Sequence, residues 1–244
     1  MIEQTLEIAT ADGSCTTFIA HPDRDGPHPL ILFYMDAPGI REELRDMARR
    51  LASSGYYVML PNMYYRAGVM ELGPLDMDPA SSSRKRMFEL MGSLTIALVM
   101  ADSDALIAYA DTDRAANTAK IGAMGYCMSG RYAISAAARY PDRVTAAASI
   151  YGVQLVTDAP DSPHLTARQA SAELYVACAE TDSYAPPEMI AALDATFKSD
   201  FVNAEIEWYP GTHHGFAFPQ RAVYDKAAAE RHWVRLHSLF GRHL

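Results

Sequence analysis

The feature that most constrains the fold is a repeated alternation of short apolar runs with segments of helical period. The runs typical of strands are residues 29–35 (PLILFYM), 56–61 (YYVMLP), 120–126 (KIGAMGY), 144–152 (VTAAASIYG), 172–180 (AELYVACAE) and 204–211 (AEIEWYPG). The segments typical of helices are 41–54, 84–109 with a break near Gly92, 129–140, one that starts near Pro186, and 224–240. Such alternation predicts an α/β fold with a mainly parallel sheet and helices on both faces.

The remaining pattern predicts one domain over residues 1–244. Residues 5–21 (TLEIATADGSCTTFIAH) alternate around a turn and predict a β-hairpin. We find no internal repeat and no linker. Residues 62–83 form an irregular stretch, and loops of that length commonly line or cover a site. Ligands of parallel sheets bind beyond the carboxyl ends of the strands, so chemistry is expected in the residues that follow each strand.

Charge and composition exclude several classes of protein. The net charge is −9, which disfavours nucleic acid or an anionic membrane as a partner. No apolar run approaches the roughly 18 residues of a membrane span. The first residues, MIEQTLEIATADG, lack the basic start and apolar stretch of a signal peptide, so we expect a cytoplasmic protein.

Cysteine and histidine usage gives little support to a metal site. Three cysteines do not make a disulfide framework, and no CxxC or HExxH motif occurs. His213 and His214 are adjacent, but neighbours on an extended segment point apart and no ligand cluster stands near them. We expect neither a metal nor an organic cofactor.

The stretch GYCMSG places Cys127 directly after a predicted strand and directly before a predicted helix. A turn this sharp exposes its middle residue and strains the backbone, and it requires small neighbours such as Gly125. A thiol at a helix N-terminus is also easier to ionise. The alternatives are a buried inert cysteine, or Ser129 as the nucleophile. Ser129 would lie within the first helical turn and away from the apex, so Cys127 is preferred.

Two later segments that follow strands supply an acid and a base. The acid is Asp182 or Glu180, and Asp182 is preferred because it lies in a turn whereas Glu180 belongs to the strand end. The base is His213 or His214, in a loop bracketed by glycines. The order nucleophile, acid, base is the one found in α/β-hydrolases. One oxyanion donor would then be the backbone N–H of Met128. The other would be the N–H of Ala37 or Asp36, since Pro38 has no N–H, and Ala37 is preferred.

These motifs resemble those of the dienelactone hydrolase family of the α/β-hydrolase superfamily. The resemblance covers nearly the whole chain, through PLILFYMDAPGI, GYCMSGRYA, ACAETDSYAPP and YPGTHHGFAFP. It implies an α/β-hydrolase fold with Cys127, Asp182 and His214 as the catalytic triad, since Gly215 and Phe216 follow His214 as the family's pattern has them. It further implies that Asp36, where the family commonly has Glu, modulates the ionisation of the thiol.

The pocket departs from the family. Members that act on dienelactone hold the substrate carboxylate with arginines, one of them a few residues after the catalytic histidine. Here FAFP stands at that place and Arg221 comes later. Arg84 or Arg86 would supply a cation for a substrate carboxylate. Tyr64, Tyr65 and Phe218 instead predict an aromatic pocket that prefers less anionic substrates.

The sequence therefore predicts a cysteine-dependent hydrolase of a small-molecule ester or lactone, acting through a covalent acyl-enzyme, as a monomer or homodimer. An alternative is a non-catalytic protein on a hydrolase scaffold, in which Cys127 is an oxidation sensor or binds a ligand. A transferase or haloacid-type hydrolase is less favoured, because those usually have Ser or Asp at the elbow.

Overall fold

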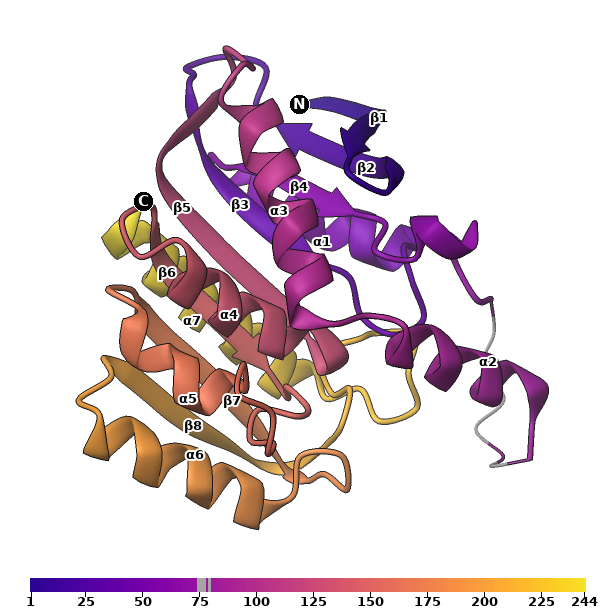
Figure 1. The fold of residues 1–244 in the computed structure, drawn as a ribbon, viewed down its shortest axis with the longest axis vertical. Coiled ribbons are helices and arrows are strands. Elements are labelled where there is room, and N and C mark those ends of the chain that lie inside the picture. Colours follow the sequence, from indigo (N-terminus) through magenta and orange to yellow (C-terminus); the bar gives the residue numbers. More distant parts are fainter. Residues whose placement is uncertain (74–77, 79) are drawn as a thin grey trace. The chain divides into compact units, whose positions relative to one another are not determined.

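A computed structural model describes residues 1–73, 78 and 80–244 (Figure 1). The chain divides into two compact units, Met1–Thr118 and Ala119–Leu244, each of which is described by itself. Part of the stretch 62–83, including Pro74 and Pro79, lies outside the described residues.

The first unit is built from four strands and three α-helices among its described residues. The strands are β1 (Ile2–Thr10), β2 (Gly13–His21), β3 (His28–Tyr34) and β4 (Tyr57–Pro61), and the helices are α1 (Glu42–Ser53), α2 (Ser82–Gly92) and α3 (Ile96–Ala110), with a short 3-10 turn η1 (Tyr65–Ala67). The strand order is β1-β2-β4-β3, with β3 and β4 parallel and the other pairs antiparallel. The predicted hairpin is confirmed as β1 and β2.

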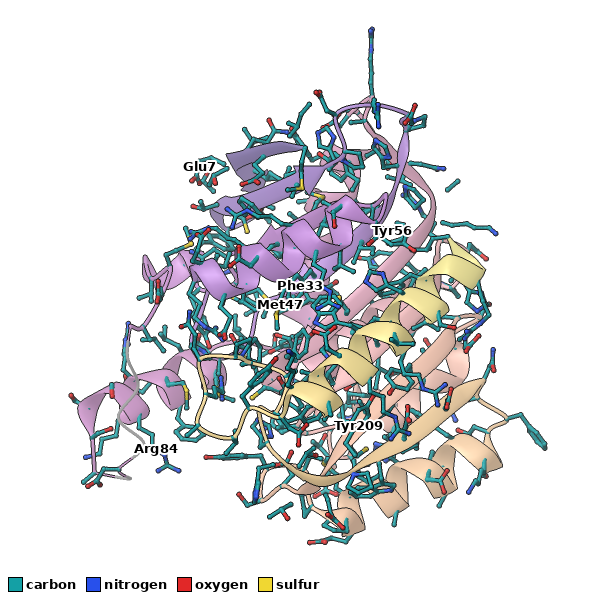
Figure 2. All side chains as sticks on the ribbon, turned by 180° about the vertical axis from the view of Figure 1, so that it is seen from behind. Glu7, Phe33, Met47, Tyr56, Arg84 and Tyr209 are labelled. Carbon is teal, nitrogen blue, oxygen red and sulfur yellow. The ribbon has the colours of Figure 1, made fainter. Side chains whose placement is uncertain are left out.

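Local sequence explains these elements. All five residues of β4 are buried, as expected of a strand covered on both faces. The predicted break near Gly92 is confirmed, because α2 ends at Gly92 and α3 starts at Ile96. Each helix begins at a hydroxyl N-cap: Ser81 accepts from the Arg84 N–H, and Thr95 accepts from the Leu98 N–H. Helices α1 and α3 lie on opposite sides of this unit's strands (Figures 1 and 2).

The second unit has four parallel strands in the order β5-β6-β7-β8. They are β5 (Ala116–Tyr126), which starts at the last residues of the first unit, β6 (Val144–Ile150), β7 (Glu173–Thr181) and β8 (Ala204–His213). The helices are α4 (Gly130–Arg139), α5 (Pro163–Thr166), α6 (Pro187–Ser199) and α7 (Lys226–His243), with 3-10 turns η2 (Cys127–Ser129) and η3 (Ala167–Gln169). Helix α4 lies on one face of these strands and α7 on the other (Figures 1 and 2).

The predicted mainly parallel α/β fold is confirmed, with two local differences. The short helix α5 was not predicted, and β8 runs to His213 rather than ending near Gly211. No single helix of the described chain is long and apolar enough to cross a bilayer. Helices α2 and α3 pass that test of length and composition only as a pair bent by 73°.

Candidate active site

The ends of three strands in the second unit carry the predicted chemistry. Cys127 follows β5 at once, Asp182 follows β7 at once, and His214 follows β8 at once. Because these strands are parallel, their carboxyl ends lie along the same edge of this unit's sheet.

Cys127 occupies a sharp turn with a strained backbone. Its φ is +54°, a left-handed conformation that costs a non-glycine residue roughly 1–2 kcal/mol. The turn η2 leads directly into α4, so the thiol stands at the N-terminal end of a helix. The side chain is partly exposed, whereas Ser129 is completely buried. Of the two candidate nucleophiles, only Cys127 is open to solvent.

Close packing beneath the turn explains its small residues. A Cβ on Gly125 would lie 2.3 Å from the carbonyl oxygen of Ser129, so no larger residue fits there. A Cβ on Gly130 would lie 2.2 Å from Ser149 Oγ and 2.7 Å from the Cα of Gly152. The residue after Gly152 completes the support, because the Val153 N–H donates to the Cys127 carbonyl over 3.1 Å.

Asp182 and His214 form a direct pair. His214 Nδ1 lies 2.7 Å from Asp182 Oδ2, and the other carboxylate oxygen accepts the backbone N–H groups of Tyr184 and Ala185. The Asp182 side chain is 1% exposed and that of His214 11%. The competing residues lie elsewhere: Glu180 is exposed and accepts the N–H of Gly211, and His213 is exposed.

The surroundings favour the protonated imidazole of His214. Burial works against its charge, but the negative charge and hydrogen bond of Cys127 and the carboxylate of Asp182 outweigh it and raise the pKa of His214 to about 10. Among the described residues the buried Nε2 atom has no hydrogen bond of good geometry, although Cys127 is near enough to help raise the pKa of His214. Such contacts in free enzymes commonly tighten once substrate binds.

The other two cysteines have the opposite character. Burial raises the pKa of the Cys15 thiol to about 12, and burial together with the charge of Asp182 raises that of Cys178 to about 12. Both thiols therefore stay protonated and unreactive at neutral pH.

Two tyrosines that the sequence analysis did not single out flank the histidine. The ring centroids of Tyr151 and Tyr184 each lie 5.0 Å from that of His214, in edge-on arrangements. Tyr151 is buried and has a φ of +37°, whereas Tyr184 is 38% exposed. Their positions directly after β6 and just after β7 were the only signal, since residues that follow strands border ligand sites.

In the first unit, Asp36 is held by an arginine that the sequence analysis did not consider. Arg41 binds both carboxylate oxygens of the completely buried Asp36, at 2.6 and 3.2 Å, and also binds Glu43 at 2.8 Å. The two carboxylates raise the pKa of the Arg41 guanidinium against the effect of its burial. Asp36 is therefore a paired carboxylate within its own unit.

Ala37 and Tyr64 also meet in the first unit. The Tyr64 hydroxyl donates to the Ala37 carbonyl oxygen at 2.9 Å, and the Tyr64 side chain is 1% exposed. The Ala37 turn is closed by a hydrogen bond from the Gly39 N–H to the Asp36 carbonyl. Tyr64 thus fixes the orientation of the peptide group that contains the Ala37 carbonyl.

The predicted substrate cations lie on α2 (Figure 2 labels Arg84). Arg86 is exposed and forms an ion pair with Glu89 at 3.2 Å. The Arg84 guanidinium lies over the ring of Phe88, and within the described part of the chain its buried Nε has no hydrogen-bond partner.

Beyond the histidine, Phe218 is completely buried, and its ring centroid lies 5.1 Å from that of Tyr126. The Arg221 guanidinium lies over the Phe218 ring at 5.0 Å. The side chain of Arg221 also covers Gly215, since a Cβ there would lie 2.9 Å from Arg221 Cδ. Arg221 therefore comes later in the sequence than the family's arginine, but its side chain lies beside Gly215, the residue after His214.

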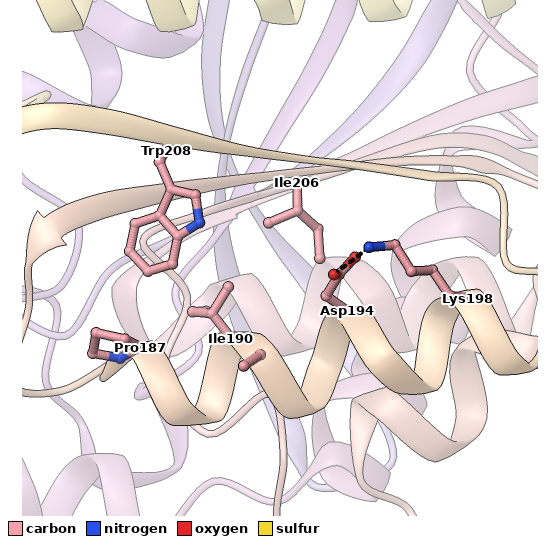
Figure 3. Close-up of a pocket in the computed structure, with 7 residues that line it drawn as sticks. Pro187, Ile190, Asp194, Lys198, Ile206 and Trp208 are labelled. Carbon is pink, nitrogen blue, oxygen red and sulfur yellow. Dashed lines mark hydrogen bonds and ion pairs between the residues drawn. The ribbon is translucent and has the colours of Figure 1, made fainter.

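A groove of about 350 Å³ lies elsewhere in the second unit, between α6 and β8 (Figure 3). It is lined by Pro187, Ile190, Ala191, Asp194, Lys198, Ile206 and Trp208. None of the predicted catalytic residues lines it. Among the described residues, no three His, Cys, Asp or Glu side chains are grouped so as to hold a metal ion.

A strained residue after one strand, an acid after another and a histidine after a third, in that order along a mainly parallel α/β chain, define an α/β-hydrolase. The sequence profile of the Dienelactone hydrolase family matches residues 15–244, and the chain belongs to this family. The predicted family, the fold class and an enzyme of the hydrolase class are thereby confirmed.

Relatives agree with this assignment. A protein of Methylorubrum extorquens named "Putative carboxymethylenebutenolidase" is 29% identical over 98% of this chain and 81% of its own length. A solved structure titled "Putative Dienelactone Hydrolase" from Klebsiella pneumoniae is 25% identical, with a TM-score of 0.88 over 99% of both chains. A dienelactone hydrolase-like promiscuous phosphotriesterase from metagenomic libraries shares the fold, with a TM-score of 0.82, 20% identity, and coverage of 99% and 98% of the two chains.

Proposed function

We propose that the protein hydrolyses carboxylic esters or lactones through a Cys127–Asp182–His214 triad and a covalent acyl-enzyme. One observation carries this proposal: the buried His214 ring holds the Asp182 carboxylate at 2.7 Å through Nδ1 and also interacts with the Cys127 thiol. A base placed between a carboxylate and a thiol is the arrangement that activates a cysteine nucleophile. We further propose that the two units together make one hydrolase domain, since the family profile spans both.

In the proposed reaction the thiolate of Cys127 attacks the acyl carbon, and the carbonyl electrons move to oxygen. Imidazolium Nε2 of His214 then gives its proton to the departing alkoxide, which leaves as an alcohol or, in a lactone, stays tethered to the acyl group. The same nitrogen next takes a proton from water, whose oxygen attacks the thioester carbonyl; the C–S bond then breaks, the acid is released and Cys127 leaves as the thiolate. Asp182 keeps the proton of Nδ1 in place throughout, because its Oδ2 accepts from that nitrogen.

The proposed oxyanion donors are the N–H groups of Met128 and Ala37. Met128 follows the nucleophile in the turn η2, as this role requires. Tyr64, which we predicted to contact substrate, is proposed instead to orient the Ala37 loop through its hydrogen bond to the Ala37 carbonyl. Asp36 is proposed to tune the thiol as a carboxylate whose two oxygens are both bound by Arg41.

For the substrate we propose a small ester or lactone, in line with the names of the relatives. Arg84 and Arg86 are still predicted to bind a substrate carboxylate. Of the two, Arg84 is the better candidate because Glu89 already neutralises Arg86. Phe218 would shape the pocket from behind as part of an aromatic cluster rather than by direct contact, since it is completely buried. A cytoplasmic location and a monomer or homodimer remain predictions from the sequence.

The experiment is a turnover screen of esters and lactones, with and without a free carboxylate, on wild type, Cys127→Ala and Ser129→Ala. Cys127→Ala should lower kcat by at least about 10³-fold, whereas Ser129→Ala should be mild. Wild-type rates in Cys127→Ala would refute the mechanism. A strong preference for carboxylate-bearing lactones would support the arginine assignment.

The second candidate, a thiol sensor, is favoured by the partial exposure of Cys127 at a helix N-terminus. It would be preferred if the purified protein reacted quickly with peroxide and turned over no ester or lactone. A sensor, however, has no need of the Asp182–His214 pair.

A further inference from the structure

A second histidine, His232, is completely buried on helix α7, and the proposed reaction does not use it. Its Nε2 lies 2.8 Å from the hydroxyl oxygen of Tyr126. Its Nδ1 faces the backbone carbonyl oxygen of Ala229, one turn earlier in the same helix. Both ring nitrogens therefore have partners in the core of the second unit.

These partners determine where the protons are. A carbonyl oxygen can only accept, so Nδ1 of His232 carries the hydrogen and donates it to Ala229. With the hydrogen on Nδ1, the neutral tautomer accepts the hydroxyl hydrogen of Tyr126 at Nε2, so both ring nitrogens have a hydrogen-bond partner, as buried polar groups require.

Tyr126 immediately precedes Cys127, so its position affects the strained turn directly. The Tyr126 ring is completely buried, and its centroid lies 5.7 Å from that of His232 and 5.1 Å from that of Phe218. The His232 ring also meets Phe216 edge-on at 6.2 Å. Phe216 and Phe218 belong to the loop that carries His214. His232 therefore contacts both Tyr126, which precedes Cys127, and the loop that carries His214.

We propose that His232 is a positioning residue of this site: by accepting the Tyr126 hydroxyl and packing against Phe216, it sets the distance between the Cys127 thiol and His214. This inference rests on the proposed function for its turnover readout. It does not need that function for its second readout, the chemical reactivity of Cys127. A displacement of 1 Å between reacting groups is enough to reduce a rate about 10²-fold.

The test is a double-mutant cycle of Tyr126→Phe and His232→Leu, with His232→Gln as the conservative variant. Each single change removes one side of the Tyr126–His232 hydrogen bond, whereas the double variant removes both sides. We expect each single variant to lower kcat for an activated ester on the order of 10- to 100-fold with little change in KM. The double variant should fall no further than the worse single one, and His232→Gln, whose amide oxygen accepts from the tyrosine, should recover most of the rate.

The second readout is the pH dependence of Cys127 alkylation by iodoacetamide. A displaced His214 stabilises the thiolate less, so alkylation in the single variants should be slower near neutral pH and its profile should move to higher pH. Tyr175→Phe is the matched control, because it removes another buried hydroxyl, one that bonds Glu207 and Tyr209 at 2.7 Å. It should change thermal stability but leave the alkylation profile in place.

Opposite results overturn the inference. Independent, multiplicative losses in the double variant would do so, as would an unshifted alkylation profile in correctly folded Tyr126→Phe. If wild type turned over no ester while the alkylation profiles shifted as expected, the proposed hydrolysis would fail and the positioning role of His232 would stand.

Discussion

Nδ1 of His214 lies 2.7 Å from Oδ2 of Asp182, while Oδ1 of the same carboxylate is occupied by two backbone N–H groups. The carboxylate cannot rotate without losing those bonds, so only Oδ2 is presented to the imidazole.

This geometry predicts the effect of Asp182→Asn. The amide oxygen will keep the two backbone donors, and the NH₂ group will face Nδ1. The imidazole must then carry its proton on Nε2, the wrong tautomer for a base, and kcat should fall about 10⁴-fold. Steady-state kinetics on an activated ester measures this. Glu180→Gln, at the exposed carboxylate, should be nearly neutral, and an equal loss there would contradict the assignment of the acid.

The raised pKa of His214 predicts a pH-dependent stability. Below pH 6.5, the ordinary value, folded and unfolded chains both hold the proton and the stabilisation is complete. As pH rises from there towards about 10 only the folded chain holds it, so the free energy of unfolding should fall progressively, with the contribution lost above that value. Denaturant unfolding at a series of pH values checks this. The decline should be shallower in His214→Asn, and identical slopes would contradict the raised pKa.

Gly125→Ala should damage the elbow. The new methyl group would lie 2.3 Å from the Ser129 carbonyl oxygen, so strand and helix must separate. We expect a loss of about 1–3 kcal/mol of stability together with most of the activity. The matched control is Gly241→Ala in α7, where nothing lies within 4 Å of the added atom. A helical alanine there should gain up to about 1 kcal/mol. Retained turnover in Gly125→Ala would show that the elbow tolerates expansion.

Arg41→Met should destabilise the first unit strongly. It leaves the carboxylate of Asp36 buried without its cation, which typically costs about 3–5 kcal/mol. Chemical denaturation measures the loss, and adding Asp36→Asn should restore part of it. Arg86→Met breaks an exposed ion pair and should change stability by no more than about 1 kcal/mol. Equal effects of the two arginine variants would refute the buried pairing.

The strands predicted best from the sequence are those that can be recognised from their own apolar run, without knowing how they pair with a neighbouring strand. All five residues of β4 are buried, so its continuous apolar run was enough to predict the strand. The extension of β8 to His213 could not be predicted from residues 204–211. It depends on a register shift in the neighbouring strand β7, after which Thr181 of β7 pairs with His213. Helix α5 has only four residues, too few to show a period.

The site shows the same division. A strained cysteine between a strand and a helix has a local signature, so Cys127 was recognisable in GYCMSG. The tyrosine rings beside His214 come from the ends of β6 and β7, and the Asp36–Arg41 pair depends on how a loop turns. Contacts between side chains from different strands or from a folded loop leave no periodic trace in a sequence.

The crowding around Gly125, Gly130 and Gly152 also determines which positions of this enzyme tolerate substitution. Substitutions at these positions should mostly yield destabilised variants, since an added methyl group would lie 2.2 to 2.3 Å from a neighbouring atom at each of them. Tyr184 is 38% exposed beside His214, so it accepts replacement without repacking a core. A library intended to alter substrate range should therefore diversify Tyr184 and inherit the three glycines unchanged.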